Sequence, residues 1–171
     1  MNELTCTISD SLREIKVGAL KQQNVLTVYE GWSIKKLSEF FIKHNISGAP
    51  VIAADDELIG VVTQSDVVQF EIKKPDEKEI AKIIESYIGP FGQLQQTDIE
   101  RIKTRAIEYC TVNSIMTPSV HSMDESASLY DAYKLIKKHD IHRLFITRNS
   151  LLVGVITAMD ILNYIVDSEL S

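Results

Sequence analysis

Two patterns of apolar and polar residues occur along this chain, and each occurs twice, once in each half. The first pattern places apolar residues at the spacing i, i+3, i+6, i+7, which is one face of a helix. Ser33 and Ser128 stand directly before the two copies of this pattern, and serine is a favoured N-cap residue. We therefore expect two amphipathic helices, with these apolar faces: Ile34, Leu37, Phe40 and Phe41, and Leu129, Ala132, Leu135 and Ile136.

The second pattern is extended. Stretches rich in β-branched residues lie on both sides of turn residues, which predicts one β-hairpin over 51–62 and another over 145–156. A short extended segment precedes each helix, and a second helix is expected after Thr63 and after Thr157. Each half thus has the order β-α-β-β-α, and the fold class is α+β. Gly60 and Gly154 interrupt strands, which indicates a close approach of backbone or ligand, or of one half to the other.

The two halves are diverged copies of one unit. Residues 43–46 match 138–141 at an offset of 95, and 60–66 match 154–160 at an offset of 94. Between the copies, apolar residues at helical spacing flank a Gly-Pro-Phe-Gly break, which predicts a helical hairpin. We therefore expect four parts: an N-terminal segment (1–16), a first copy (17–70), a helical insert (71–111) and a second copy (112–167).

Composition and charge narrow the function classes. The 171 residues are 44% hydrophobic, which is typical of a globular chain, and the net charge of −6 argues against a nucleic-acid partner. No apolar run approaches the ~20 residues of a membrane span, and the first ten residues do not resemble a signal peptide. With only Cys6 and Cys110, a disulfide framework is not expected, and the cytoplasm is the expected location.

The repeat, its β-α-β-β-α order and the ending Gly-apolar-x-apolar-Thr-x-x-Asp resemble the CBS domain, the cystathionine β-synthase motif. In the second copy, 112–118 (Val-Asn-Ser-Ile-Met-Thr-Pro) resembles the family's opening, and 141–144 (Ile-His-Arg-Leu) is similar to segments of the γ subunit of AMP-activated protein kinase. The first copy keeps Gly-Ala-Pro-Val at 48–51 but has Lys-Gln-Gln at 21–23 in place of Met-Thr-Pro. The resemblance covers about 110 of the 171 residues.

This resemblance implies tandem CBS domains related by an approximate two-fold axis, which together are called a Bateman module. It also implies two clefts that can bind AMP, ADP, ATP or S-adenosylmethionine, with no cofactor required. Such modules often associate, so we expect a homodimer formed through helix faces that carry Phe40 and Phe41 or the isoleucines of the insert. Since no output domain is recognised, either an effector protein would read the bound state or the module would be a fragment of a larger protein.

The candidate site residues allow two interpretations. From the residues alone, Thr63 with Asp66, and Thr157 with Asp160, form a helix cap with an acid in the first turn. The resemblance instead implies that the Asp binds ribose and the Thr contacts phosphate. That role has a physical basis, since a carboxylate accepts hydrogen bonds from a diol and a helix N-terminus offers free N–H groups.

The resemblance also implies further ligand-binding residues for the two clefts. It implies that His142 and Arg143 face a phosphate, and arginine suits that role because its planar fork binds two oxygens. Each cleft would also combine one copy with the other copy's first strand. The expected ligand-binding residues are therefore Thr157, Asp160, Val25 and Leu26 in one cleft, Thr63, Asp66, Val120 and His121 in the other, and in addition Pro50, His142 and Arg143.

The two clefts are not equivalent in sequence. The first copy has Ser47 and Gly48 where the second has His142 and Arg143, so we expect the Arg143 cleft to bind more tightly. The other cleft would lack a cation unless Lys21 or Arg143 reaches it. Phe145 replaces the family's usual proline, and we expect its bulk to narrow the Asp160 cleft.

Catalytic and metal chemistry have weaker support. There is no Gly-x-x-x-x-Gly-Lys-Ser/Thr loop and no nucleophile with an adjacent base, so an enzyme is not expected. His139 and His142 are three residues apart, but no further ligand completes a metal site. The alternative to a ligand sensor is a dimerising structural or interaction module with vestigial clefts. An enzyme with an unrecognised site is the remaining interpretation.

Overall fold

The chain folds into two units whose boundaries cut across the repeat. A computed structural model describes residues 8–73, 75–88 and 96–169. One unit, here called the C-terminal unit, consists of Met1–Val25, Asp56–Leu58 and Val120–Ser171, and the other, the central unit, consists of Leu26–Asp55 and Ile59–Ser119. The residues before the first strand therefore fold with the second copy of the repeat.

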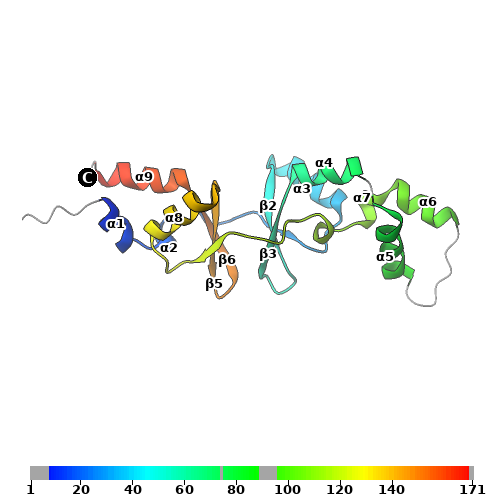
Figure 1. The fold of residues 1–171 in the computed structure, drawn as a ribbon, viewed down its shortest axis with the longest axis horizontal. Coiled ribbons are helices and arrows are strands. Elements are labelled where there is room, and N and C mark those ends of the chain that lie inside the picture. Colours follow the sequence, from blue (N-terminus) through cyan, green and yellow to red (C-terminus); the bar gives the residue numbers. More distant parts are fainter. Residues whose placement is uncertain (1–7, 74, 89–95, 170–171) are drawn as a thin grey trace, which may run out of the picture. The chain divides into compact units, whose positions relative to one another are not determined.

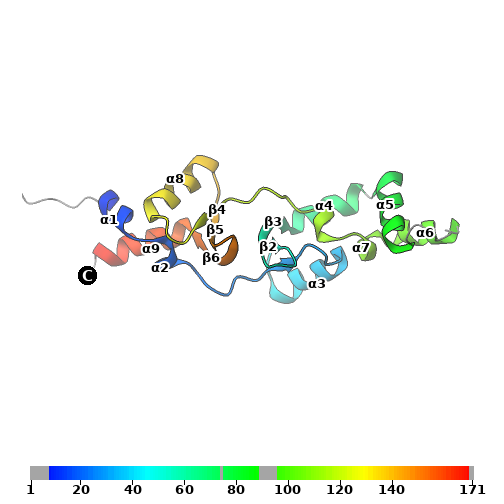
Figure 2. The same cartoon turned by 90° about the horizontal axis from the view of Figure 1, so that it is seen from below.

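The C-terminal unit contains a three-stranded sheet in the order β4-β5-β6. Strands β4 and β5 are parallel, whereas β5 and β6 form an antiparallel hairpin. Helix α9 contacts both α8 and β6 (Figures 1 and 2). The elements of this unit are α1 (Ile8–Glu14), α2 (Val17–Leu20), β4 (Ser122–Asp124), α8 (Leu129–His139), β5 (Arg143–Arg148), β6 (Leu151–Thr157) and α9 (Ala158–Glu169).

The central unit repeats this arrangement with the sheet order β1-β2-β3, in which β1 and β2 are parallel. Its elements are β1 (Val28–Tyr29), α3 (Ile34–His44), β2 (Gly48–Ile52), β3 (Leu58–Thr63), α4 (Gln64–Lys73), α5 (Glu77–Ile88), α6 (Gln96–Thr104), α7 (Ala106–Tyr109) and a 3-10 turn, η1 (Val112–Ser114). The α+β class and the repeated β-α-β-β-α order predicted from the sequence are therefore confirmed.

Local signals explain where α3 and α8 begin and end. The Ser33 hydroxyl accepts a hydrogen bond from the Lys36 N–H (3.2 Å), and the Ser128 hydroxyl accepts one from the Asp131 N–H (3.1 Å). At the other end, Asn45 and Asp140 both adopt the left-handed conformation with φ of 51°. Asn and Asp tolerate this conformation better than most residues, so both helices stop at the same place in the repeat.

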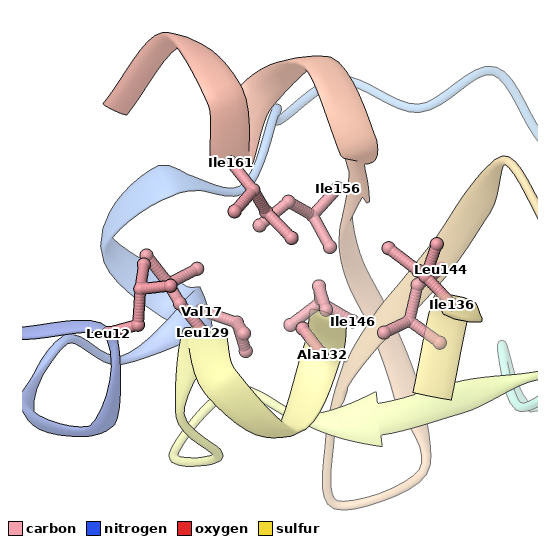
Figure 3. Close-up of a cluster of buried hydrophobic side chains, with 9 residues drawn as sticks. All are labelled: Leu12, Val17, Leu129, Ala132, Ile136, Leu144, Ile146, Ile156 and Ile161. Carbon is pink, nitrogen blue, oxygen red and sulfur yellow. The ribbon is translucent and has the colours of Figure 1, made fainter. Parts of the chain in front are cut away.

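The core of the C-terminal unit joins the two ends of the chain. Figure 3 shows Leu12 from the N-terminal segment and Val17 from the start of the first copy beside side chains from α8, β5, β6 and α9. Val17 is fully buried, as are Leu144 and Ile156 on the sheet. Because burial of each such side chain contributes about 1.5–3 kcal/mol, this contact fixes the N-terminal segment to the second copy. The nine clustered residues are Leu12, Val17, Leu129, Ala132, Ile136, Leu144, Ile146, Ile156 and Ile161.

Each copy begins with an opening segment, 17–23 in the first copy and 112–118 in the second. This segment pairs through backbone hydrogen bonds with the last strand of the other copy, β6 or β3. Gln22 and Val155 exchange backbone hydrogen bonds of 2.8 and 3.1 Å, and Val61 and Thr117 exchange bonds of 3.0 and 2.9 Å. A Cβ at Gly154 would lie 2.8 Å from the Gln22 carbonyl oxygen, and one at Gly60 would lie 3.0 Å from that of Thr117. The close approach of backbone that these glycines indicate is therefore confirmed.

The segment between the copies contains helices α5, α6 and α7, with turns and bends between them. Ile80 and Ile84 of α5 form a small core with Ile102 of α6. The Gly-Pro-Phe-Gly break at 89–92 lies outside the described residues. Among the helices that are described, none is long and apolar enough to cross a membrane.

The helix faces proposed for dimer contact are already covered. Phe41 is buried, and Phe40 packs edge-on against Trp32 with 5.3 Å between ring centroids. Ile80 and Ile84 are buried in the insert. These faces are therefore largely covered within the central unit, although Phe40 is only half-buried, and the homodimer itself stays a prediction.

Candidate ligand-binding sites

Each Thr-x-x-Asp motif forms the same hydrogen-bonded cap at the end of a hairpin. Asp66 Oδ2 accepts bonds from the Thr63 N–H and hydroxyl, both at 2.7 Å, and Asp160 Oδ2 accepts the same pair from Thr157 at 2.7 and 2.6 Å. In return, each Thr hydroxyl accepts a bond of 3.3 Å from the Asp N–H. The capping interpretation therefore holds in both copies, and in both it leaves Oδ1 for another partner.

The two aspartates differ in what Oδ1 binds. Asp160 Oδ1 accepts a hydrogen bond of 2.8 Å from the Gln22 side-chain amide. Asp66 Oδ1 has no partner among the residues that the structure describes. Burial of Asp160 acts to raise its pKa, but the hydrogen bonds from Thr157 and Gln22 outweigh it, and the net pKa lies below the usual value. Asp160 is thus a satisfied carboxylate, whereas Asp66 has an oxygen available.

A hollow of about 710 Å³ lies beside Asp66 in the central unit. This volume falls within the ~300–1,000 Å³ of small-molecule sites. Helix α4 supplies Asp66, Phe70 and Lys73, and the insert supplies further walls, among them Lys82 of α5. The opening segment of the second copy closes another side through 111–115.

A smaller hollow, of about 350 Å³, lies beside Asp160 in the C-terminal unit. It has the same place in the repeat, because four of its residues on α9 and one on the opening segment correspond to lining residues of the Asp66 hollow. These residues are Leu20, Asp160, Asn163, Tyr164 and Asp167, which correspond to Ile115, Asp66, Gln69, Phe70 and Lys73.

The predicted phosphate-binding pair lies close to one cap but outside its hollow. Arg143 begins β5 and is the Cα partner of Thr157 across the hairpin. Both His142 and Arg143 are exposed, and neither has an ion pair or side-chain hydrogen bond within the described part of the chain. Phe145 is half-buried and is not among the residues lining the Asp160 hollow, so the structure gives no sign that it narrows this site.

The other predicted residues are distributed between the units. Val25 is half-buried in the unit that holds Asp160, whereas Leu26 belongs to the central unit. Val120 and His121 belong to the C-terminal unit, with the His121 ring 4.3 Å from that of His139. Pro50 is buried in β2 and does not line the Asp66 hollow. The partnership of Asp160 with Leu26, and of Asp66 with Val120 and His121, therefore stays a prediction.

Lys21, one of the two cations that the sequence leaves open for the Asp66 cleft, is paired within the C-terminal unit. Its ammonium forms an ion pair of 2.6 Å with Glu125, and its side chain is only 8% exposed. Arg148 also binds Glu125, and the hydrogen bonds from Arg148 and Lys21 lower the pKa of Glu125 to about 2. This network lies within the C-terminal unit and joins the start of the first copy to the second copy.

Sequence reasoning missed Gln22, Lys73 and Lys82. The amide of Gln22 was noted only as a departure from Met-Thr-Pro, and its contact with Asp160 depends on the tertiary fold. The difference between Lys73 and Asp167 is visible in the sequence when the copies are aligned at an offset of 94. Lys82 has no equivalent, because it belongs to the insert.

Two groups that could take part in catalysis have shifted pKa values. Burial, together with the charge of Glu79, raises the pKa of Cys110 to about 11, so its thiol is protonated at neutral pH. Burial and the neighbours His121 and Lys138 lower the pKa of His139. Within the described residues, no three His, Cys, Asp or Glu side chains come together as a metal site.

Comparison with known proteins supports the doubled pattern. The sequence model of the CBS domain matches residues 17–73 and again 112–167. An uncharacterized protein of Methanocaldococcus jannaschii, MJ1404, is 26% identical over 159 residues, which are 93% of this chain and 34% of that protein. The matches to two further relatives from the same organism span 41% and 42% of those proteins. The chain therefore spans less than half the length of each of these three relatives.

Solved structures share the fold. CBSX2 of Arabidopsis thaliana, solved in complex with AMP, superposes with a TM-score of 0.60 at 22% identity over 90% of this chain and 98% of that one. The CBS domain pair of protein MJ0100, solved with 5′-methylthioadenosine and S-adenosyl-L-methionine, gives a TM-score of 0.57 at 17% identity over 90% and 98% of the two chains. At these identities the likeness establishes a common fold.

Proposed function

Because this chain belongs to the CBS domain family and carries two copies of the domain, we propose that it is a regulatory module that binds an adenosyl compound. The ligands of two proteins of the same fold support this class, since one binds AMP and the other binds 5′-methylthioadenosine and S-adenosyl-L-methionine. The role is binding and regulation, without a catalytic step.

The observation that carries the proposal is the state of Asp66. Its Oδ2 is fixed by Thr63, so the carboxylate is oriented, and its Oδ1 is available at the wall of the large hollow. A fixed carboxylate oxygen can accept hydrogen bonds from a ribose diol without a large loss of side-chain entropy. The apolar walls, such as Phe70 and Ile83, suit an adenine ring.

The Asp160 hollow is a second, weaker candidate site. Ribose binding there requires the Gln22 amide to leave Asp160, and the hollow has about half the volume of the other. Arg143, in register with Thr157, supplies a cation near this cap. The geometry therefore favours Asp66 as the tighter site, whereas the sequence alone favoured the site near Arg143.

Regulation would follow because ligand binding shifts the population of the chain towards one arrangement of its segments. A ligand that contacts both α4 and the opening segment of the second copy favours the arrangement in which these segments are held together. An effector protein, or a further part of a longer chain, would then recognise that arrangement.

Dimerisation is a further part of the proposal, through faces that differ from those first expected. Exposed apolar residues lie one turn apart on the last helix of each copy, and some of them occupy equivalent positions. A second copy of the chain would cover them. They are Val68 and Ile72 on α4, and Met159, Leu162 and Val166 on α9.

A thermal-shift panel tests the ligand class. AMP, ADP, ATP, 5′-methylthioadenosine and S-adenosylmethionine are added in turn to the wild-type chain and to the Asp66→Ala variant. Ligand binding to the folded state raises the melting temperature, and we expect a rise that the variant loses. No shift with any compound would support the alternative, a structural module with vestigial clefts.

A further inference from the structure

Two lysines at the Asp66 hollow have no anionic partner among the residues that the structure describes. Lys73 ends α4 and Lys82 lies on α5, and both line the hollow. Neither forms an ion pair or side-chain hydrogen bond within the described residues. Lys21 and Lys35, by contrast, are paired with glutamates. Two unpaired cations at one hollow are notable in a chain whose net charge is −6.

Both acids at the same hollow are held in place by hydrogen bonds within their own segments. Glu79 Oε2 accepts a hydrogen bond of 3.0 Å from the Asp76 N–H, while Asp76 Oδ1 accepts one of 2.9 Å from the Glu79 N–H. This reciprocal pair is a capping box, and it holds the Glu79 carboxylate at the start of α5. Asp66 is fixed by Thr63. Neither carboxylate forms a salt bridge with Lys73 or Lys82.

The equivalent hollow in the C-terminal unit is lined by acidic charges alone, whereas the Asp66 hollow has two lysines beside its two acids. Asp167 stands in place of Lys73, so Asp160 and Asp167 line it without a cation among its lining residues. The helical insert follows only the first copy. Residues 74–111 lie outside both segments that match the CBS domain, so Lys82 is an addition to the repeated unit.

We propose that Lys73 of α4 and Lys82 of the insert bind phosphate and make the Asp66 hollow selective for adenosine 5′-phosphates. This proposal rests on the proposed function. A lysine ammonium donates up to three hydrogen bonds, and such bonds to phosphate oxygens are charge-assisted. S-adenosylmethionine carries a sulfonium cation, which two nearby ammonium groups repel. In a chain of net negative charge, these local cations decide whether an anionic ligand is attracted.

Calorimetric titration of the full chain with ATP, adenosine and S-adenosylmethionine tests this selectivity. The variants are Lys73→Ala, Lys82→Ala and the double variant. Lys78→Ala is the matched control, because Lys78 is exposed on the same α5 helix but does not line the hollow. We expect each single variant to bind ATP about ten- to a hundredfold more weakly with adenosine nearly unaffected, and Lys78→Ala to bind as wild type.

Several results would overturn the proposal. One is equal loss of ATP and adenosine affinity in Lys73→Ala and Lys82→Ala, another is no loss beyond that of Lys78→Ala, and a third is tighter binding of S-adenosylmethionine than of ATP by the wild type. Lys82→Arg keeps the charge, so its retention of ATP binding supports the assignment even if Lys82→Ala does not fold. Failure of the proposed function itself looks different: the wild type then binds none of the three compounds, or binds them independently of Asp66.

Discussion

The side-chain amide of Gln22 donates a hydrogen bond of 2.8 Å to Asp160 Oδ1, which links the opening of the first copy to the end of the second. The equivalent of Gln22 in the second copy is Thr117, and this residue makes no side-chain hydrogen bond to Asp66. The two caps are therefore alike in backbone and different in the availability of their carboxylates. This difference underlies the assignment of the ligand site to Asp66.

Replacement of Gln22 by alanine tests that contact. Asp160 has a lowered pKa in the folded state, so it contributes stability above the unfolded value of 3.8, and this contribution is lost as pH falls through the folded value. Gln22→Ala should raise the pKa of Asp160 and lower the free energy of unfolding at pH 7 by about 1 kcal/mol. An NMR titration of the Asp160 carboxyl and denaturant unfolding at several pH values measure both. An unchanged pKa would show that the bond does not form in solution.

Gly154 should be intolerant of a side chain. A Cβ there would lie 2.8 Å from the Gln22 carbonyl oxygen, which is backbone and is held by its bond to Val155. Gly154→Ala should therefore cost about 1–3 kcal/mol and lower the melting temperature by several degrees. Gly31→Ala is the matched control, because a Cβ at Gly31 meets no atom within 4 Å. Equal melting temperatures for the two variants would contradict the crossing of the opening segment over β6.

The Glu125 network should give a pH-dependent contribution to stability. Its pKa is lowered to about 2 by Arg148 and Lys21, from an ordinary value of 4.5. The ionised group therefore stabilises the folded state above pH 4.5, and this stabilisation is lost as pH falls towards 2. Glu125→Gln should be less stable than wild type at pH 6, with a difference that narrows between pH 4.5 and 2 and decreases with salt. A difference that is constant over this range would exclude the charge as its cause.

The proposed dimer contact can be tested by placing a charge on each of two exposed helix faces. Val68 is exposed on α4, and Ile42 is exposed on α3, the helix of the face first expected from the sequence. We expect wild-type chain to have a dimer mass by light scattering at micromolar concentration. Val68→Glu should give a monomer because it places a charge in the contact, while Ile42→Glu should stay dimeric. A monomeric wild type, or dissociation by Ile42→Glu alone, would contradict the proposed face.

Most of the secondary structure follows from local signals. Ser33 and Ser128 mark helix starts, and the apolar spacing after each of them predicts the buried helix face correctly. Gly60 and Gly154 in the strands indicate a close approach of backbone from the sequence alone, and the structure has it at both positions. These features are predictable because they depend on residues near in sequence and on a pattern that the chain repeats.

The difference between the Asp66 and Asp160 sites could not be predicted from the sequence alone. The likeness of Thr63-x-x-Asp66 and Thr157-x-x-Asp160 describes the cap, but the free oxygen of Asp66 depends on which residue the crossing segment brings to it. Lys21 was a plausible cation for the Asp66 cleft until its pairing with Glu125 was seen. Such contacts join residues about a hundred positions apart, so local pattern does not determine them.

Calorimetric titration of ATP into Asp66→Asn and Asp160→Asn tests the central claim most directly. Both variants remove the charge from the same kind of threonine-bonded cap, so each controls for the other's loss of stability. If Asp66 binds the ribose, Asp66→Asn weakens ATP binding by about 1.5–3 kcal/mol while Asp160→Asn stays close to wild type. Equal weakening in both variants, or weakening in Asp160→Asn alone, would contradict the assignment of the adenosyl site to Asp66.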